Sequence, residues 1–243
     1  YPMEFIYEKK VGEVVAEDYR AAAVFQKYGI DFCCKGNISI DEACSRQNLM
    51  TEDVMRDLKI LFASDKNHPA DYQSWSPAFL ADFIVETHHR YVQEKTPVIL
   101  SYLAKLCQKH GGRHPELLEI NKLFSDSATE LASHMEKEEQ ILFPRIRNLA
   151  TMNADGPQDH LVTSSSLNAP IKVMMHEHDN EGERFKKIDI LTDHYQPPAD
   201  ACNTYKVTYS LLQEFENDLH LHIHLENNIL FPKAVQMEKE LMN

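Results

Sequence analysis

Apolar residues recur at helical spacing over most of the chain beyond residue 76. This pattern predicts long helices over residues 78–109, 115–149, 171–191 and 202–241. The Gly111–Gly112 pair ends the first of them, and short or moderate connections join the others. Such an arrangement is typical of an up-down four-helix bundle. The predicted fold class is therefore all-α, with the bundle over residues 77–243.

The beginning of the chain has shorter periodic segments and predicts a small helical domain over residues 1–65. One helix is expected over residues 11–28, where Gly29 ends the apolar pattern, and two more over residues 40–48 and 51–62. The turn after the first helix carries the adjacent pair Cys33–Cys34. Residues 66–76 are polar and contain proline, so they predict a linker.

Charge and composition narrow the classes of function. The chain has 25 Lys and Arg against 38 Asp and Glu, a formal net charge of −13, which argues against nucleic acid or an anionic membrane surface as a partner. No apolar run is long enough to predict a membrane span, and the first twenty residues lack the apolar stretch of a signal peptide. The five cysteines include no CxxC pair and fit a reducing compartment, so a cytoplasmic location is expected.

One motif occurs twice within the predicted bundle and is the strongest chemical signal in the chain. Both copies read HxxxExxILFP, the first with His134 and Glu138 and the second with His222 and Glu226. Positions i and i+4 share one face of a helix, so each copy directs an imidazole and a carboxylate to the same point. A single HxxxE pair is commonly a solvated pair, but two copies in apolar, matching surroundings favour a metal site.

Each copy also has a histidine upstream at nearly the same separation. His89 precedes the first copy and His178 the second, so the bundle reads as two helical hairpins of the same design. Four imidazoles and two carboxylates could then hold two ions, each with two histidines. Both carboxylates could bridge the ions, leaving positions open for an oxygen bridge or an exogenous ligand. Ligands of this kind, without thiolates, favour iron or manganese over structural zinc.

The rise per residue of an α-helix shows which histidines can lie at the same level of the bundle and bind one metal centre. His89 and His134 both lie about 30 Å from the turn between their helices, hence at the same height. His110 lies about 31 Å along the helix from His89 and cannot share its site. His88 points about 100° away from His89, so we expect His89 to be the ligand and keep His88 as the alternative. In the second hairpin, His178 and His222 lie at the same distance from the turn between their helices only if residues 196–198 extend the third helix.

The two motif copies, HMEKEEQILFP and HIHLENNILFP, resemble the paired ligand motifs of the hemerythrin-like domain in the di-iron family of iron–sulfur cluster repair proteins. KYGIDFCCKGN resembles the double-cysteine signature of that family's small N-terminal domain. The resemblance covers nearly the whole chain and implies a hemerythrin-like bundle and a homodimer. It places the di-iron ligands at His89, His134, Glu138, His178, His222 and Glu226, and the cysteine pair at Cys33 and Cys34.

Oxygen-carrying hemerythrins differ from this chain at two points. They use a fifth histidine and an aspartate bridge, whereas Glu226 stands at the bridge position here and no fifth histidine is placed. Reversible oxygen carriage is therefore disfavoured. The resemblance implies repair of iron–sulfur clusters damaged by nitrosative or oxidative stress, by donation of iron to damaged or apo iron–sulfur proteins. On this hypothesis the protein is an iron donor without catalytic residues rather than a turnover enzyme.

Other interpretations stay open at this point. A nitric oxide or oxygen reductase at the same di-iron site is the alternative, and a sensor or carrier of either gas is a third. Cys33 and Cys34 would serve docking, metal transfer or redox control, or else would simply pack as small apolar side chains. Because they follow a helix and precede Lys35 and Gly36, their thiolates are expected to be accessible and somewhat stabilised.

Overall fold

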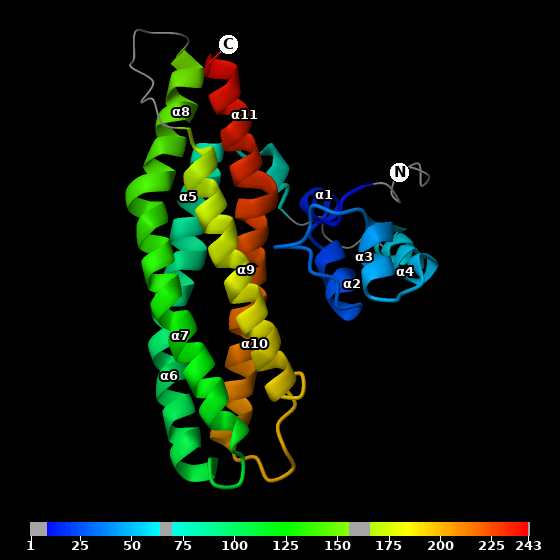
Figure 1. Ribbon diagram of the computed structural model, residues 1–243, viewed down its shortest axis with the longest axis vertical. Helices are drawn as coiled ribbons and strands as arrows, with labels where there is room; N and C mark the ends of the chain where they lie inside the picture. The colour runs from blue at the N-terminus through cyan, green and yellow to red at the C-terminus, as the bar shows by residue number, and fades with distance from the viewer. Residues whose placement is uncertain (1–8, 64–69, 156–165, 243) are drawn as a thin grey trace.

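The computed structural model describes residues 9–63, 70–155 and 166–242, and its regular secondary structure is helical (Figure 1). The predicted all-α fold is confirmed: in these ranges extended backbone pairs only at the isolated bridge between Lys10 and Ser39. None of the helices in the described ranges is long and apolar enough to cross a membrane.

The N-terminal unit consists of α1 (Val11–Glu17), α2 (Ala21–Lys27), α3 (Ile40–Arg46) and α4 (Thr51–Ala63). The prediction of one helix over residues 11–28 is wrong, because the chain breaks at Asp18. Asp18 has extended backbone angles (φ −148°, ψ 101°), and its carboxylate accepts hydrogen bonds from the backbone N–H and the guanidinium of Arg20. Such local bonding by an aspartate competes with helix continuation.

Four long helices run up and down beside this unit and form the bundle (Figure 1). Three of the four contain a short π-helical segment, labelled η. In chain order the segments are α5 (Pro77–Phe83), η3 (Ile84–His89) and α6 (Arg90–His110); α7 (Glu116–Lys137), η4 (Glu138–Leu142) and α8 (Phe143–Asp155); α9 (Asn168–Leu191); and α10 (Asn203–Leu225), η5 (Glu226–Leu230) and α11 (Phe231–Met242).

The ends of two of these helices differ from the prediction. α8 continues to Asp155, past the predicted end at Leu149, and residues 156–165 of the predicted loop lie outside the described residues. α9 ends at Leu191, so the extension through residues 196–198 that equal heights in the second hairpin would have required does not occur. Asp193, His194 and Tyr195 instead adopt positive φ angles, which turn the chain away from the helix axis.

The π-helical segments η4 and η5 occur at the two copies of the repeated motif. Pro144 and Pro232 follow them as the second residues of α8 and α11. Proline has no N–H to donate to the carbonyl four residues earlier and its ring crowds that carbonyl, so a regular α-helix is disfavoured there. A wider π turn accommodates this, and such turns are frequent at functional sites.

Two apolar clusters fill the bundle on either side of a buried polar layer. One includes Leu80, Phe143 and Phe231, and the other includes Phe124 and Phe215. The second cluster also contains most of the buried apolar residues of the N-terminal unit, and Ala16 of that unit belongs to the first cluster, so the unit shares its core with the bundle. The buried polar layer is where the predicted metal ligands lie.

Part of the predicted linker packs against the bundle. η2 (Tyr72–Ser74) is a short 3₁₀ turn, and Trp75 places its ring 4.9 Å from that of Tyr72 and 5.0 Å from that of Phe83. Lys233 of α11 donates hydrogen bonds to the carbonyls of Gln73 and Trp75. The predicted boundary between residues 65 and 66, and linker residues 66–69, lie outside the described residues.

Candidate metal centre

The six side chains predicted to bind metal come together in the buried polar layer of the bundle, and each is at most 3% exposed. Their ligand atoms form two groups, and within each group all of these atoms lie within 4.8 Å of one another. Each group has two histidines, and both glutamates belong to both groups. The groups are His89, Glu138, His222 and Glu226, and His134, Glu138, His178 and Glu226.

The Nε2 atoms of the histidines face the shared carboxylates. Nε2 of His178 lies 3.0 Å from Oε2 of Glu226, and Nε2 of His222 lies 3.1 Å from Oε1 of the same residue. Oε2 of Glu138 lies 3.3 Å from Nε2 of His134 and 3.4 Å from Nε2 of His89. The carboxylates therefore lie between the two pairs of imidazoles, where each could bridge two cations.

Several polar atoms of this layer are buried without a hydrogen-bond partner in the described part of the chain. They include both carboxylate oxygens of Glu138, Oε2 of Glu226 and Nε2 of His89, which make no hydrogen bond although carboxylate and imidazole atoms lie as close as 3.0–3.4 Å. A buried polar atom without a partner is costly, and a buried carboxylate especially so. A cation between the two groups would bond to these atoms, and imidazole with carboxylate is a donor set that suits iron. The residues present thus fit a di-iron centre, although their role as iron ligands stays a prediction.

The outward-facing Nδ1 atoms of three of these histidines are held by neighbouring side chains. Nδ1 of His89 lies 2.8 Å from Glu139, Nδ1 of His134 lies 2.8 Å from Glu177, and Nδ1 of His178 lies 2.9 Å from Oδ1 of Asn227. Each of these bonds leaves Nε2 free to face the carboxylates, which is the usual arrangement around metal-binding histidines.

These three supporting residues were not predicted from the sequence. Glu139 and Asn227 each directly follow the glutamate of a motif copy, so the position after HxxxE was an available signal. Glu177 had no comparable signal, because it reaches His134 from another helix, 43 positions along the chain.

The electrostatics of the layer follow from the close approach of two carboxylates and four imidazoles. Burial alone lowers the pKa of His134, but the Glu138 and Glu226 carboxylates outweigh it and raise that pKa to about 10. Burial raises the pKa of Glu226, but His222 and His178 outweigh it and hold that pKa well below its usual value. In the metal-free protein the carboxylates therefore stay ionised and protonated imidazole compensates them, a role that a bound metal cation would take over.

His88 and His110 lie outside both groups. His88 places Nδ1 3.0 Å from Asp218 and stacks on the His222 ring, so it is His89 and not His88 that faces the glutamates. His110 lies at the other end of α6, with Nε2 3.4 Å from Sγ of Cys202.

The double-cysteine turn lies against the outside of the same layer. The Cys34 thiol donates a hydrogen bond to the His178 carbonyl at 3.4 Å, and the Asn227 amide donates one to the Cys33 carbonyl at 3.3 Å. The expectation of an accessible, stabilised thiolate is wrong for Cys33, which is 3% exposed. Hydrogen bonding with the neighbouring Cys34 and burial raise the pKa of Cys33 well above its usual value.

Two cavities open next to these groups. A cavity of about 320 Å³ between α7 and α9 is lined by His134, Glu177 and His178, so it reaches one side of the candidate metal centre. A larger cavity of about 540 Å³ lies between the N-terminal unit and the bundle, and Asp31, Cys33 and Cys34 belong to its lining.

Comparisons with known proteins agree with both halves of this architecture. Residues 81–234 match the hemerythrin HHE cation binding domain, and residues 7–61 match ScdA_N, a domain of unknown function. The chain is 34% identical to the "Probable iron-sulfur cluster repair protein" of Haemophilus influenzae, over 94% of this chain and 97% of that protein. It is 35% identical to the iron-sulfur cluster repair protein YtfE of Musicola paradisiaca, over 95% and 98%. It is 32% identical to the iron-sulfur cluster repair protein ScdA of Staphylococcus haemolyticus, over 93% and 97%.

Proposed function

This chain belongs to the family of iron–sulfur cluster repair proteins with a hemerythrin-like domain, and from that membership we propose that it repairs damaged clusters by donating iron. The damage is that caused by nitrosative or oxidative stress, and the clients are damaged or apo iron–sulfur proteins. The protein acts in the cytoplasm as a homodimer, and nitric oxide or oxygen can occupy the open positions of its centre.

The observation that carries this proposal is the composition of the candidate centre. Its donors are imidazole nitrogens and two shared carboxylates, with no thiolate among them. The sites of iron–sulfur clusters offer soft thiolate ligands, which select iron for cluster assembly. Iron held by nitrogen and oxygen donors can therefore pass to a thiolate-rich acceptor with a gain in binding strength.

The cavity between α7 and α9 supports release of iron from one side of the centre. Glu177 lines this cavity, is 28% exposed at its side chain, and bonds both to Nδ1 of His134 and to Lys137. Movement of this exposed carboxylate would free His134 to turn away from the centre. Once iron has left, Nε2 of His134 takes up a proton and compensates the buried carboxylates, in keeping with its raised pKa.

The same cavity supports the alternative function. Its volume of about 320 Å³ admits a diatomic gas to the His134 and His178 side of the centre. A nitric oxide or oxygen reductase at this centre is therefore the second candidate, and it differs from iron donation because it turns over many times without losing iron.

The test is a repair assay with isotopically labelled iron. The full chain, loaded with labelled iron, is mixed with an iron–sulfur enzyme whose cluster nitric oxide has damaged, and enzyme activity and label are followed together. Iron donation predicts that activity returns as the label enters the client's cluster, and that metal-free protein restores little. If metal-free protein repairs equally well, donation is wrong. Repeated formation of nitrous oxide with all label retained would instead support the reductase.

A further inference from the structure

Asp31, Cys33 and Cys34 bring a carboxylate and two thiols together on the face of the N-terminal unit that contacts α9 and α10. The two Sγ atoms lie 3.8 Å apart, and Sγ of Cys33 lies 3.4 Å from Oδ1 of Asp31. All three ligand atoms lie within 4.8 Å of one another. We propose that these three residues form a second metal site, separate from the bundle centre, for a thiophilic divalent cation such as ferrous iron or zinc.

The distances match those that a tetrahedral ion requires. Metal–sulfur bonds of about 2.3 Å and metal–oxygen bonds of about 2.0–2.2 Å, at tetrahedral angles, place two sulfurs about 3.8 Å apart and a sulfur and an oxygen about 3.5–3.7 Å apart. The observed sulfur–sulfur separation of 3.8 Å agrees with the first value, and the observed sulfur–oxygen separation of 3.4 Å lies just below the second. Binding at Cys33 and Asp31 therefore needs little movement of the turn.

Hydrogen bonds hold the turn in this arrangement. Oδ1 of Asp31 accepts bonds from the backbone N–H groups of Cys33 at 3.1 Å and Cys34 at 2.9 Å, which brings adjacent cysteines onto the same side. Asn228 of η5 donates to the Cys33 carbonyl at 3.3 Å, in addition to the bond from Asn227. The bundle thus fixes the backbone of the turn, so the ligands are positioned before any cation arrives.

α9 leaves space for one of the thiols at Gly182. A Cβ atom at this position would lie 3.3 Å from Sγ of Cys34, closer than most such contacts. A glycine inside a helix costs about 1 kcal/mol relative to alanine. The close approach of Cys34 to α9 explains why a glycine occupies this helical position.

The chemistry of binding is an exchange of protons for a cation. A divalent ion forms bonds to Sγ of Cys33, Sγ of Cys34 and a carboxylate oxygen of Asp31, and both thiols lose a proton to solvent. One of these protons is the one that Cys34 donates to the His178 carbonyl. Three protein ligands leave the fourth tetrahedral position open, and the cavity of about 540 Å³ gives a second metal or a client ligand access to it.

The location of the site suggests its use, and this step rests on the proposed function. Cys34 lies 3.4 Å from the carbonyl of His178, whose imidazole belongs to the bundle centre. A cation leaving the nitrogen and oxygen donors of that centre would find thiolates nearby, and a thiolate-bound ion resembles the one that a client cluster receives. The second site is therefore a transfer site for iron on its way to the client.

Cobalt is the probe that tests the site. Co²⁺ is added to the full chain, with its thiols kept reduced by a phosphine. Because the bundle centre contains no thiol, a thiolate-to-cobalt charge-transfer band in the near ultraviolet reports cysteine ligands alone. We expect the band to saturate at one Co²⁺ per chain, with release of about two protons per ion. Absence of this band in the intact protein overturns the proposal.

Matched variants locate the band. Cys33→Ser and Cys34→Ser should each abolish it or weaken Co²⁺ binding strongly, whereas Cys202→Ser should leave it unchanged. Asp31→Asn keeps the oxygen that accepts the backbone hydrogen bonds but removes the charge of a direct ligand. The turn should therefore stay folded, and Co²⁺ binding should weaken by at least the factor of about 10–100 that loss of a group orienting a ligand costs. A band that survives Cys33→Ser, or one that Cys202→Ser removes, would place the cobalt elsewhere and overturn the assignment.

The transfer role has its own readout. Asp31→Asn should keep the iron content of the bundle centre but slow the movement of labelled iron into a client. A cobalt band without an effect of Asp31→Asn on iron movement would overturn the transfer role and keep the second site. Failure of iron donation in the repair assay would overturn the proposed function whether or not the cobalt band is present.

Discussion

His178 and Asn227 are joined by a hydrogen bond of 2.9 Å from the imidazole Nδ1 to the amide Oδ1. The amide nitrogen of the same asparagine donates to the carbonyl of Cys33 at 3.3 Å. One buried side chain therefore orients a predicted iron ligand and also holds the double-cysteine turn in place. A change at Asn227 should affect both the bundle centre and the N-terminal unit.

Asn227→Ala should weaken iron retention by about 10–100-fold, because groups that orient metal-binding histidines commonly contribute that much to metal affinity. The measurement is the amount of iron that a competing chelator removes at equilibrium. Asn228→Ala is the matched control, since Asn228 bonds to the Phe32 and Cys33 carbonyls and lies 3.1 Å from His224, which belongs to neither group of predicted ligands. Equal iron loss from both variants would show that Asn227 acts only through the turn.

Glu138→Gln and Glu226→Gln should each lower the iron content of the protein. Both carboxylates are fully buried and shared by the two groups of ligand atoms, so removing one negative charge leaves two cations less compensated. Iron per chain is measured after expression in iron-rich medium. Glu181→Gln is the control, because this buried carboxylate bonds to Ser127 and Arg184 and belongs to neither group. Full iron content in either test variant would contradict the assignment of a bridging role.

His89→Ala should strip iron, whereas His110→Ala should leave the iron content nearly unchanged. Both histidines are buried on the same long helix, but only His89 faces the glutamates, while His110 lies near Cys202 at the other end of α6. The absorption spectrum of the oxidised protein and its iron content are measured together. Loss of metal from His110→Ala would mean that the centre extends beyond the six residues.

Glu216 should make the stability of the protein depend on pH. Burial, with a contribution from the nearby Asp189 carboxylate, raises the pKa of Glu216 to about 7 in spite of the Tyr195 hydroxyl. An acid whose pKa is raised by folding stabilises the fold when it is protonated. That stability is fully present below the unfolded pKa of about 4.5 and is lost as pH rises through about 7, at most about 3 kcal/mol in all.

The matched comparison for Glu216 is the variant Glu216→Gln, which keeps the shape and cannot ionise. Denaturant unfolding at about pH 5 and about pH 8 should show a larger loss of stability with rising pH for the parent protein than for the variant. An equal loss in both proteins would mean that Glu216 ionises in the fold without cost.

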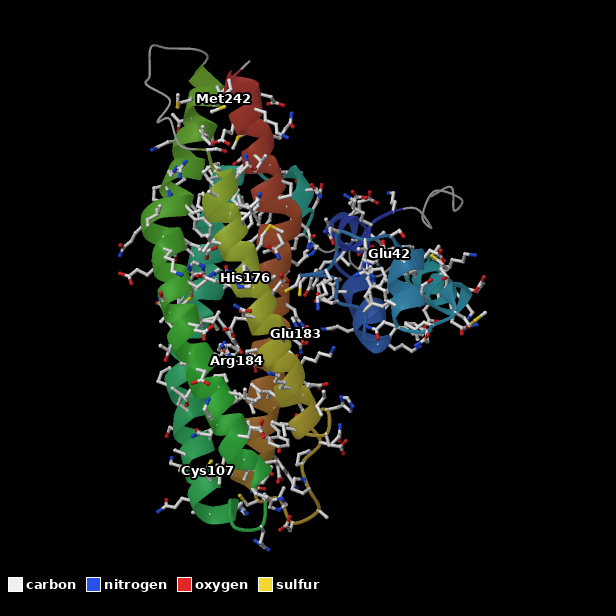
Figure 2. All side chains as sticks on the ribbon, viewed as in Figure 1. Glu42, Cys107, His176, Glu183, Arg184 and Met242 are labelled. Atoms are coloured by element: carbon white, nitrogen blue, oxygen red, sulfur yellow. The ribbon has the colours of Figure 1, made fainter. Side chains whose placement is uncertain are left out.

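Replacing both cysteines of the turn, as Cys33→Ala/Cys34→Ala, should leave the iron content and the spectrum of the bundle centre unchanged, because neither thiol belongs to the bundle groups. The same variant should restore a nitric-oxide-damaged iron–sulfur enzyme more slowly than the parent protein. Cys107→Ala serves as the control, since Cys107 lies near the far end of the bundle (Figure 2) and donates to the Leu117 carbonyl. Repair at the full rate would show that the thiols have no part in it.

The N-terminal unit also contacts the bundle through charged side chains on its surface. Lys35 pairs with Glu183 at 2.8 Å, and Figure 2 shows Glu183 on the side of α9 that faces this unit. Both side chains are more than half exposed, so solvent and salt screen the pair and it contributes little to stability. Burial of the turn and its hydrogen bonds to Asn227 and Asn228 are the stronger links between the two parts.

The sequence alone determined which side chains share a helix face. His134 and Glu138, like His222 and Glu226, are four residues apart on one helix, and the helical period is a local property that needs no tertiary contact. For the same reason the all-α fold and the approximate course of the long helices could be predicted. The break at Asp18 could not be predicted, because the apolar pattern continues through this position. The helix ends there because the Asp18 carboxylate accepts a hydrogen bond from the backbone N–H of Arg20.

Only the tertiary structure decided what surrounds the candidate centre. Whether His88 or His89 faces the glutamates depends on how η3 is rotated about its axis relative to the other helices. The two histidines are adjacent in the sequence, so the sequence does not determine this rotation. Glu177 reaches His134 from another helix, and Cys34 reaches the His178 carbonyl across 144 positions of sequence. Such contacts arise from the packing of whole elements, whose relative placement is set by the sum of many apolar contacts and leaves no mark in local spacing.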